Sequence, residues 1–449
     1  MNKKLIIGLI GASALLVACG DNFLTGGELT NDPNRPTQAT SGQLLTGIEA
    51  NVWAQLQSDP ARVTNMWVQQ LQGEIQQYFA IYNYQVDEQT TNGFQVSLYT
   101  GGGLVDIRKL ESQAAASHDS LTLGIAQTME ALLVGTGADM FGNLTYTQAL
   151  TSTLNPTLDS QLAIYDSVQS LLTQAVKNMA ASGPSNAGPG SNDLAYGGDA
   201  ASWIRLAHTL KARYLMHTAE VRSTVYPQVL AEAKQGITDP SQNFNAVFSG
   251  NANEQNFWYQ FDVVQRTGYL APDPQFVALL KSRNDPRLGA YFNADLTDLN
   301  DSLIAPNHTQ PIVTANEGLL LAAEAAQRTG DNATALTDLN QERALNGLPA
   351  EAAGLTGRAL LSEILIEEYI ADFQNLEAWN LYKRTCTPNL VPVTTGGSFN
   401  GKIPARFPYD ASERNTNSNI PPLSQQPARN PNDPANATSD GTGGKCLGQ

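Results

Sequence analysis

The sequence predicts a mainly α-helical protein: stacked tetratricopeptide-like helix pairs, with an irregular region of low strand content packed against them. Three observations support this fold class. Apolar residues recur at i, i+3 and i+4 spacing between residues 41 and 241, with interruptions, and again between 315 and 385. Glycine or polar breaks close most of these segments and leave short links. The remaining stretches mix Pro, Asn, Asp and aromatic residues. No strict repeat of ~34 residues can be identified, so the array resembles tetratricopeptide repeats only in the pairing of its helices.

The N-terminal segment predicts export and a lipid anchor. Lys3 and Lys4 precede an uninterrupted apolar and small-residue run at 5–17, which is too short to cross the roughly 30 Å bilayer core. This pattern is typical of a signal peptide, here residues 1–18. The tetrapeptide LVAC ends at Cys19 and looks like a bacterial lipobox, so we expect Cys19 to carry lipid and to tether the protein to a membrane. The alternative is ordinary signal cleavage that leaves Cys19 free.

The rest of the chain divides into an extended arm and one helical domain. Residues 19–42 are polar and form the arm, and residues 43–449 form the domain. Amphipathic patterns predict helices, in chain order, within 41–57, 61–78, 101–116, 121–150, 158–180, 201–221, 223–241, 315–330, 333–347 and 357–385. Helical periodicity is lost in 82–100, in a Gly/Pro-rich loop at 181–193, in a longer region at about 243–312 and in the tail, 387–449. Short strands are expected only in those last two regions.

The clearest helix pair is predicted at 316–346. Ala322, Ala323 and Ala326 lie in the first helix, Gly330 marks the break, and the second helix follows at once. Small side chains at these positions let two helices approach closely. Four tryptophans fall at helical spacing and are expected in the core: Trp53, Trp67, Trp203 and Trp379.

Composition and motifs exclude several function classes. The chain has 449 residues and a formal net charge of −16, which disfavours nucleic acid as a partner. Only four histidines are present, and no zinc-protease, nucleophile-elbow, phosphate-loop or CxxC motif occurs. We therefore expect no enzyme activity and no cofactor. The acidic segment NADLTDLND, residues 293–301, lacks the spacing and the glycine of an EF-hand loop, so it predicts a solvated loop and no metal.

Aromatic residues in polar loops are the candidate ligand-binding residues. Sugars present apolar C–H faces and hydroxyl groups, so a sugar site needs flat rings beside Asn, Gln or Asp. Two segments have this composition, residues 82–99 and 253–262. The candidates are Tyr82, Tyr84, Phe94, Tyr99, Trp258 and Tyr259, with Phe261 in the same second segment. The alternative is that these rings cap apolar clusters beneath long loops, as most loop aromatics do.

The two remaining cysteines are predicted to pair. An exported chain reaches an oxidising compartment, and Cys386 and Cys446 are the only thiols left once Cys19 is acylated. The bond would fix a Gly-rich tail that otherwise frays. The alternative is two free thiols, with Cys386 buried and Cys446 in disorder.

Six local patterns in order resemble the SusD/RagB family and cover nearly the whole chain. They are CGDNFL at the lipidated start, GADMFGNLTYTQAL (137–150), DLAYGGDAASWIRLAHTLKARYLMH (193–217), NDPRL (284–288), ILIEEYIADFQNLEAWNLYKR (364–384) with LLLAAEAAQRTGD (319–331) before it, and IPARFPYDASERNTN (403–417). No single pattern is specific, but their order is. The tail departs from the family pattern by adding GGKCLGQ.

The resemblance implies a fold and a function. The family implies four helix pairs of tetratricopeptide type, no catalysis, and a nutrient-binding lipoprotein of the outer membrane that faces the cell surface. Such a protein would act with a SusC-like TonB-dependent transporter to hold oligosaccharide or peptide for import. The competing hypothesis is a helical-repeat scaffold of the envelope without a small ligand.

Overall fold

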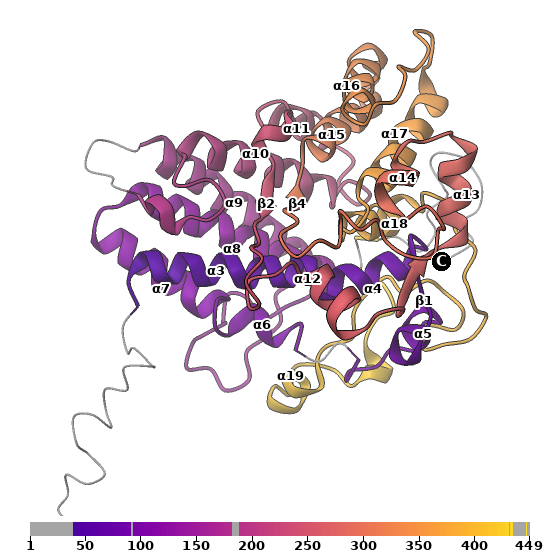
Figure 1. Ribbon diagram of the computed structural model, residues 1–449. Coiled ribbons are helices and arrows are strands. Elements are labelled where there is room, and N and C mark those ends of the chain that lie inside the picture. The colour runs from indigo at the N-terminus through magenta and orange to yellow at the C-terminus, as the bar shows by residue number, and fades with distance from the viewer. Residues whose placement is uncertain (1–38, 91–92, 182–187, 431, 434–445, 447–449) are drawn as a thin grey trace, which may run out of the picture.

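A computed structural model describes residues 39–90, 93–181, 188–430, 432–433 and 446. The signal peptide, Cys19 and almost all of the predicted arm lie outside the described residues. The mainly α fold class is confirmed (Figure 1). The longer helices are α3 (Ser41–Gln57), α4 (Asp59–Trp67), α5 (Gln76–Tyr82), α7 (Leu104–Ala116), α8 (Ser120–Phe141), α9 (Gln161–Ala180), α10 (Ala200–Met216), α11 (Tyr226–Ala233), α13 (Pro274–Ser282), α15 (Ala315–Arg328), α16 (Asn332–Leu345), α17 (Gly357–Ala371) and α18 (Glu377–Thr385).

The helices form a continuous stack in which each packs against its neighbours. Helix α8 packs against α7 and α9, α10 against α9 and α11, and α15 against α11, α16 and α17. Close approach in the middle of the stack depends on two glycines of α8. A Cβ atom at Gly124 would overlap Met179, and one at Gly135 would overlap the ring of Tyr214. The apolar interior is therefore continuous through α8, α9 and α10.

The predicted pair at 316–346 is confirmed as α15 and α16. Thr314 and Asp331 cap the two helices by accepting N–H groups of Glu317 and Thr334. Gly330 sits between them with φ of 89°, a conformation that favours glycine. Ala323, Ala326 and Ala335 are completely buried in one small cluster, as the small-residue pattern predicts.

Strands are few and short among the described residues. Strand β1 (Leu71–Gly73) pairs antiparallel with β3 (Leu270–Pro272), and β2 (Phe244–Ala246) pairs antiparallel with β4 (Gln310–Val313). Strands β2 and β3 lie in 243–312 as expected and β4 extends one residue beyond it, whereas β1 lies outside the expected regions, because residues 71–73 pair with β3. The same region also holds the short helices α12 (Phe257–Tyr259) and α14 (Arg287–Tyr291) and a π-helix, η4 (Gln260–Gln265). Helix α6 (Val96–Tyr99) and helix α19 (Ala411–Thr416) complete the set, with three 3₁₀ turns at Gly190–Asn192, Pro240–Gln242 and Leu423–Gln425.

Three predicted helices were wrong in extent. The helix expected over 61–78 ends at Trp67, because Gln69 turns to a φ of 57° and β1 then pairs with β3. The helix expected within 223–241 is only α11. The long helix expected over 357–385 breaks into α17 and α18 at 372–376, where Gln374 has a φ of 62°. In the first case the pairing of β1 with β3 overrides the periodic pattern.

The four tryptophans at helical spacing are all core residues, with at most 3% of each side chain exposed. In the described part of the chain, no helix has both the length and the apolar character needed to cross a membrane.

The tail packs across the domain instead of forming a separate unit. The ring of Phe407 contacts Trp67 and Trp379, with centroids 4.7 and 5.4 Å away. Further along, Asp410 is fully buried and its Oδ2 accepts the N–H groups of Gly93, Gln95 and Val96.

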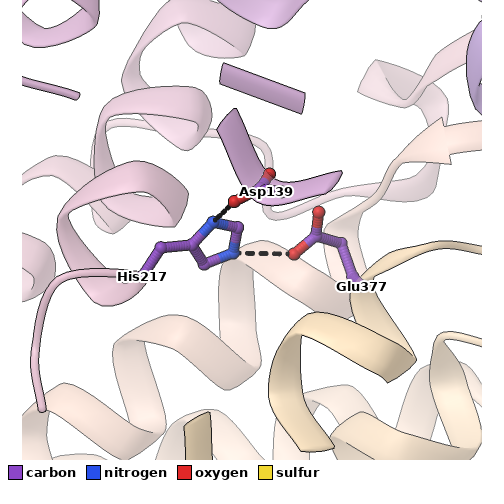
Figure 2. A group of neighbouring side chains, drawn as sticks. All are labelled: Asp139, His217 and Glu377. Atoms are coloured by element: carbon purple, nitrogen blue, oxygen red, sulfur yellow. Dashed lines mark hydrogen bonds and ion pairs between the residues drawn. The ribbon is translucent and has the colours of Figure 1, made fainter. Parts of the chain in front are cut away.

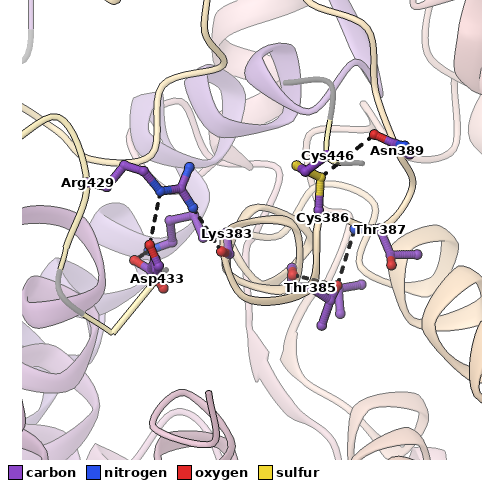
Figure 3. Close-up of a disulfide and its surroundings, with 9 residues drawn as sticks. Lys383, Thr385, Cys386, Thr387, Asn389, Arg429, Asp433 and Cys446 are labelled. Carbon is purple, nitrogen blue, oxygen red and sulfur yellow. Dashed lines mark hydrogen bonds and ion pairs between the residues drawn. A yellow bond between two sulfur atoms is a disulfide. The ribbon is translucent and has the colours of Figure 1, made fainter. Parts of the chain in front are cut away.

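A disulfide joins the tail to the end of α18. Cys386 lies at the C-terminus of α18 and is bonded to Cys446, with the two Cα atoms 6.0 Å apart (Figure 3). Beside it, buried Lys383 donates to the carbonyl of Asp139 and lies 3.9 Å from Asp433. The tail is thus attached both covalently and by charge.

Candidate functional site

Two of the predicted ligand-binding aromatics belong to the core, which corrects the expectation for them. Trp258 and Tyr84 are both 0% exposed. The side-chain oxygen of Asn256 accepts the backbone N–H of Trp258 and caps its turn, and the hydroxyl of Tyr84 accepts the N–H of Val393 in the tail. Neither ring offers an open face to a sugar, because the segments around them fold over apolar clusters.

Three more of the candidates are half-buried and lie apart from one another. Tyr82 donates its hydroxyl to Asp273 at 2.8 Å, which joins the end of α5 to the start of α13. Tyr99 lines a separate cavity of about 270 Å³ with Leu150 and Glu413. Tyr259 lies in α12. The structure does not bring these three into one site.

A cleft of about 310 Å³ does combine the two predicted segments; we call it the α5–η4 cleft. Phe94 comes from the first segment and Phe261 from the second. The cleft is lined by Asp59, Arg62 and Val63 of α4, Gln77, Tyr78 and Ile81 of α5, Thr90 and Phe94 of the following loop, and Phe261, Gln265 and Arg266 of η4 and its end. Tyr78 and Phe261 stack on each other with centroids 4.7 Å apart and are only 4% and 7% exposed, so they form the buried base of the cleft, and half-buried Phe94 is the more accessible ring.

The floor of the cleft is a short chain of charged and polar groups. Arg62 donates from Nε to the hydroxyl of Tyr78 at 2.9 Å and from Nη2 to Oδ1 of Asp59 at 2.5 Å. Tyr78 in turn donates to the same Oδ1 at 2.7 Å. Burial opposes ionisation of Asp59, but Arg62 and Tyr78 outweigh it and lower the pKa of the carboxyl below its ordinary value. Asp59 is therefore a carboxylate at neutral pH.

Asp59 keeps one oxygen free for a ligand. Its side chain is 51% exposed, and within the described residues Oδ2 has no hydrogen-bond partner. The guanidinium of Arg62, by contrast, is buried, occupied by Asp59 and Tyr78, and covered by the ring of Phe261 at 4.2 Å. The exposed amides of Gln77 and Gln265 stand on opposite sides of the cleft. The cleft thus offers an acceptor, two amides and ring surface, the groups that a neutral sugar uses.

The tail supports one wall of this cleft. Asp410 accepts the backbone N–H groups of residues 93, 95 and 96, which fixes the turn that carries Phe94. Phe94 also packs edge-on against Phe407, with centroids 5.8 Å apart.

A larger cavity, about 420 Å³, lies between α13 and residues 388–391. Its two aromatic residues, Phe276 and Tyr369, are each 1% exposed and pack against each other edge-to-face. None of the predicted aromatics lines this cavity, whereas Phe94 and Phe261 line the α5–η4 cleft, so we regard that cleft as the candidate site.

One buried cluster, Asp139, His217 and Glu377, has no local sequence signal, because its members lie on segments far apart in the chain (Figure 2). The imidazole lies between the two carboxylates, with Nδ1 2.7 Å from Asp139 and Nε2 2.9 Å from Glu377. Burial lowers the pKa of His217, but the two carboxylates outweigh burial and raise it to about 9. Arg213 and His217 in turn overcome the effect of burial and lower the pKa of Glu377 to about 2. At neutral pH the cluster is an imidazolium between two carboxylates.

This cluster does not suit a metal ion. The two ring nitrogens point in different directions, and each is already paired with its own carboxylate, so one ion cannot use the ring and both acids together. Asp139 also accepts the hydroxyl of Tyr165 at 2.5 Å. The arrangement joins α8, α10 and α18 and is structural.

In the acidic segment 293–301, the side-chain oxygens of Asn293 and Asn300 accept nearby backbone N–H groups, which forms turns.

These features define a class: a mainly α helical-repeat protein with a polar and aromatic cleft at one edge. A family model described as "Starch-binding associating with outer membrane" (SusD-like) matches residues 33–306. The chain belongs to this SusD-like family.

Solved structures with the same fold agree in overall shape. A SusD/RagB family protein from Bacteroides thetaiotaomicron is 20% identical, with 85% of this chain and 95% of that chain covered and a TM-score of 0.67. A chitin-binding SusD homolog from Flavobacterium johnsoniae is 16% identical, with 88% and 99% covered and a TM-score of 0.70. Among curated proteins, none matches the sequence at a significant level.

Proposed function

We propose that this protein is a lipid-anchored, cell-surface binding protein that captures neutral oligosaccharide for a TonB-dependent outer-membrane transporter. Family membership supports glycan binding in association with the outer membrane. The lipobox-like sequence before Cys19 supports the anchor. In this proposal the protein binds its ligand without transforming it.

The α5–η4 cleft is the observation that carries the proposal. The half-buried ring of Phe94 suits the C–H face of a pyranose, and the free oxygen of Asp59 suits a hydroxyl donor. Asp59 disfavours an acidic sugar: of the two cations that line the cleft, Arg62 already pairs with Asp59, and Arg266 is exposed to solvent.

The short, paired strands favour oligosaccharide over peptide as the ligand. Peptides commonly bind by extending the edge of a sheet. The described strands are three or four residues long and each is paired with another, so they offer little edge. The similar structure from Flavobacterium johnsoniae is that of a chitin-binding protein, which also favours a glycan.

Binding by a soluble form that begins after Cys19 tests the proposal. Glycan and peptide libraries identify the ligand class, and titration calorimetry measures affinity. Gln77→Ala and Gln265→Ala alter exposed cleft residues, and Gln235→Ala alters an exposed glutamine outside the cleft as a matched control. We expect the two cleft variants to bind at least about tenfold more weakly, as for loss of one to two hydrogen bonds, and the control to bind normally.

Two results would contradict the proposal. Equal glycan affinity in all three variants would show that the glycan does not bind in the α5–η4 cleft. Binding of peptides alone, or of neither ligand class while the lipidated protein still assembles with other envelope proteins, would favour the peptide or scaffold hypotheses. Co-purification of the lipidated protein with a TonB-dependent transporter from detergent-solubilised outer membranes tests the partner.

A further inference from the structure

Two carboxyl groups from separate segments of the chain meet beside η4. Asp262 lies within η4, and Asp298 lies in the acidic segment 293–301. The two side chains are within hydrogen-bonding reach of each other. Neither residue lines the α5–η4 cleft, so the pair is separate from the proposed capture site.

The carboxyl group of Asp262 is buried without a donor. Asp262 is 2% exposed, and both of its carboxyl oxygens are buried with no hydrogen-bond partner among the described residues. Burial raises the pKa of Asp262, Asp298 raises it further, and Arg62 lowers it by less. The guanidinium of Arg62 is already bonded to Asp59 and Tyr78. Because a buried charge is normally paired or coordinates a metal, the two facing acids require either a shared proton or a cation.

The facing carboxylate is held in place by its own turn. The side-chain oxygen of Asn293 accepts the N–H groups of Thr297 and Asp298, at 2.9 and 3.3 Å. Oδ1 of Asp298 accepts the N–H of Leu299 at 2.7 Å, which leaves Oδ2 without a donor among the described residues. Leu299 pairs with Phe292, and both are 1% exposed. The position of Asp298 is therefore fixed by the fold.

The chemistry of the pair selects the kind of cation. Its donors are carboxylate oxygens, and no histidine or cysteine of the described residues joins them in a larger group of ligands. Oxygen donors suit hard divalent cations, and calcium tolerates irregular sets of them better than magnesium does. Asp298 is half-buried, so water can complete the coordination on its solvent side.

We propose that Asp262 and Asp298 bind a calcium ion, which joins η4 to the acidic segment 293–301. The segment alone lacks the pattern of a calcium loop, and the buried ligand comes from η4. Because η4 also carries Phe261 and Gln265 of the α5–η4 cleft, the ion would stabilise one side of that cleft. The calcium site can exist whether or not the cleft binds a glycan.

Calcium titration of the purified mature protein tests the proposal. Calorimetry measures the affinity, and thermal unfolding is compared in calcium chloride and in the chelator EGTA. Asp262→Asn keeps the shape of the side chain and can donate to Asp298, so this variant is expected to fold. Asp295→Asn is the matched control, because it removes the same charge from an exposed residue of the acidic segment. A crystal of the parent protein soaked in Mn²⁺ locates the ion by anomalous scattering.

We expect calcium at about 100 times its dissociation constant to raise the melting temperature of the parent and of Asp295→Asn by roughly 3 °C. Asp262→Asn should bind calcium at least about tenfold more weakly, since loss of even an outer-shell partner costs about 10–100-fold. The soak should place an anomalous peak between Asp262 and Asp298.

Three results would overturn the proposal. A parent protein that calcium neither binds nor stabilises would leave a shared proton between the two acids. Equal loss of affinity in Asp262→Asn and Asp295→Asn would show attraction of ions by surface charge. A peak away from the pair would show an adventitious ion only. The soak of the parent decides the matter even if Asp262→Asn fails to fold.

Discussion

The guanidinium of Arg213 and the carboxylate of Glu317 form a two-point ion pair in the interior, with Nε–Oε1 and Nη2–Oε2 distances of 2.5 and 2.7 Å. Both side chains are at most 5% exposed, and Glu377 lies 3.6 Å from the same guanidinium. The pair joins α10 to α15, and Glu377 extends it through His217 to Asp139 in α8. Buried charge thus connects helices that are distant in sequence.

Removal of one partner of this pair should be costly. Arg213→Met leaves Glu317 and Glu377 buried without their cation, so we expect a loss of about 3–5 kcal/mol in unfolding free energy. Urea denaturation measures it. Arg213→Met combined with Glu317→Leu should lose less than the sum of the single variants, and simple additivity would show that the pair is not coupled.

His217 should make stability depend on pH in the alkaline range. Its pKa is raised from 6.5 to about 9 on folding, so its stabilisation is complete below about pH 6.5 and is lost as pH rises through about 9. We expect this contribution to be on the order of 2–3 kcal/mol. The difference in unfolding free energy between pH 6 and pH 9.5 should shrink in His217→Gln; an unchanged difference would show that another group titrates.

Trp258 and Phe79 should behave in opposite ways. Trp258→Ala opens a cavity in the core and should cost about 3–5 kcal/mol. Phe79 is 55% exposed on α5, so Phe79→Ala should change stability by no more than about 0.5 kcal/mol. Thermal and urea unfolding compare them. A Trp258→Ala protein as stable as its parent would show that the Trp258 side chain lies at the surface and not in the core.

The bond between Cys386 and Cys446 should be detectable by thiol counting. Denatured, mature protein should show no thiol from this pair, whereas two free thiols would exclude the bond. The bond spans a sequence separation of 60 residues. Cys446→Ser should therefore destabilise by up to roughly 4 kcal/mol, the loop-closure value for a loop of that size. Cys386→Ser with Cys446→Ser should cost little more than the single change.

Cys19→Ser should release the protein from membranes. Without the thiol no lipid can be attached, and the variant should appear in the soluble fraction. Membrane fractionation beside the parent protein measures this, and metabolic labelling with a fatty acid confirms the modification. A variant that fractionates like the parent would contradict the tether.

The helical stack was predictable because its signals are local. The spacing of apolar residues and the alanines around Gly330 appear within one or two turns of sequence. The cleft was not predictable, because it depends on contacts between distant segments. Tyr78 has the spacing of a core residue in a helix, and only the pairing of β1 with β3 ends that helix and brings Tyr78 to Phe261. Polar flanks around Trp258 and Tyr84 suggested exposure, although the backbone places both rings inward.

The tail's position in the core determines when this protein can finish folding. Asp410 bonds to Gly93 across a sequence separation of 317 residues, and Phe407 fills space beside Trp67. Pairing of such distant segments slows folding. The N-terminal half cannot close its interior until residues near 410 have been synthesised, so the unfinished chain stays open until its C-terminal segment is available. A product truncated before residue 400 would expose Trp67 and be a substrate for envelope proteases.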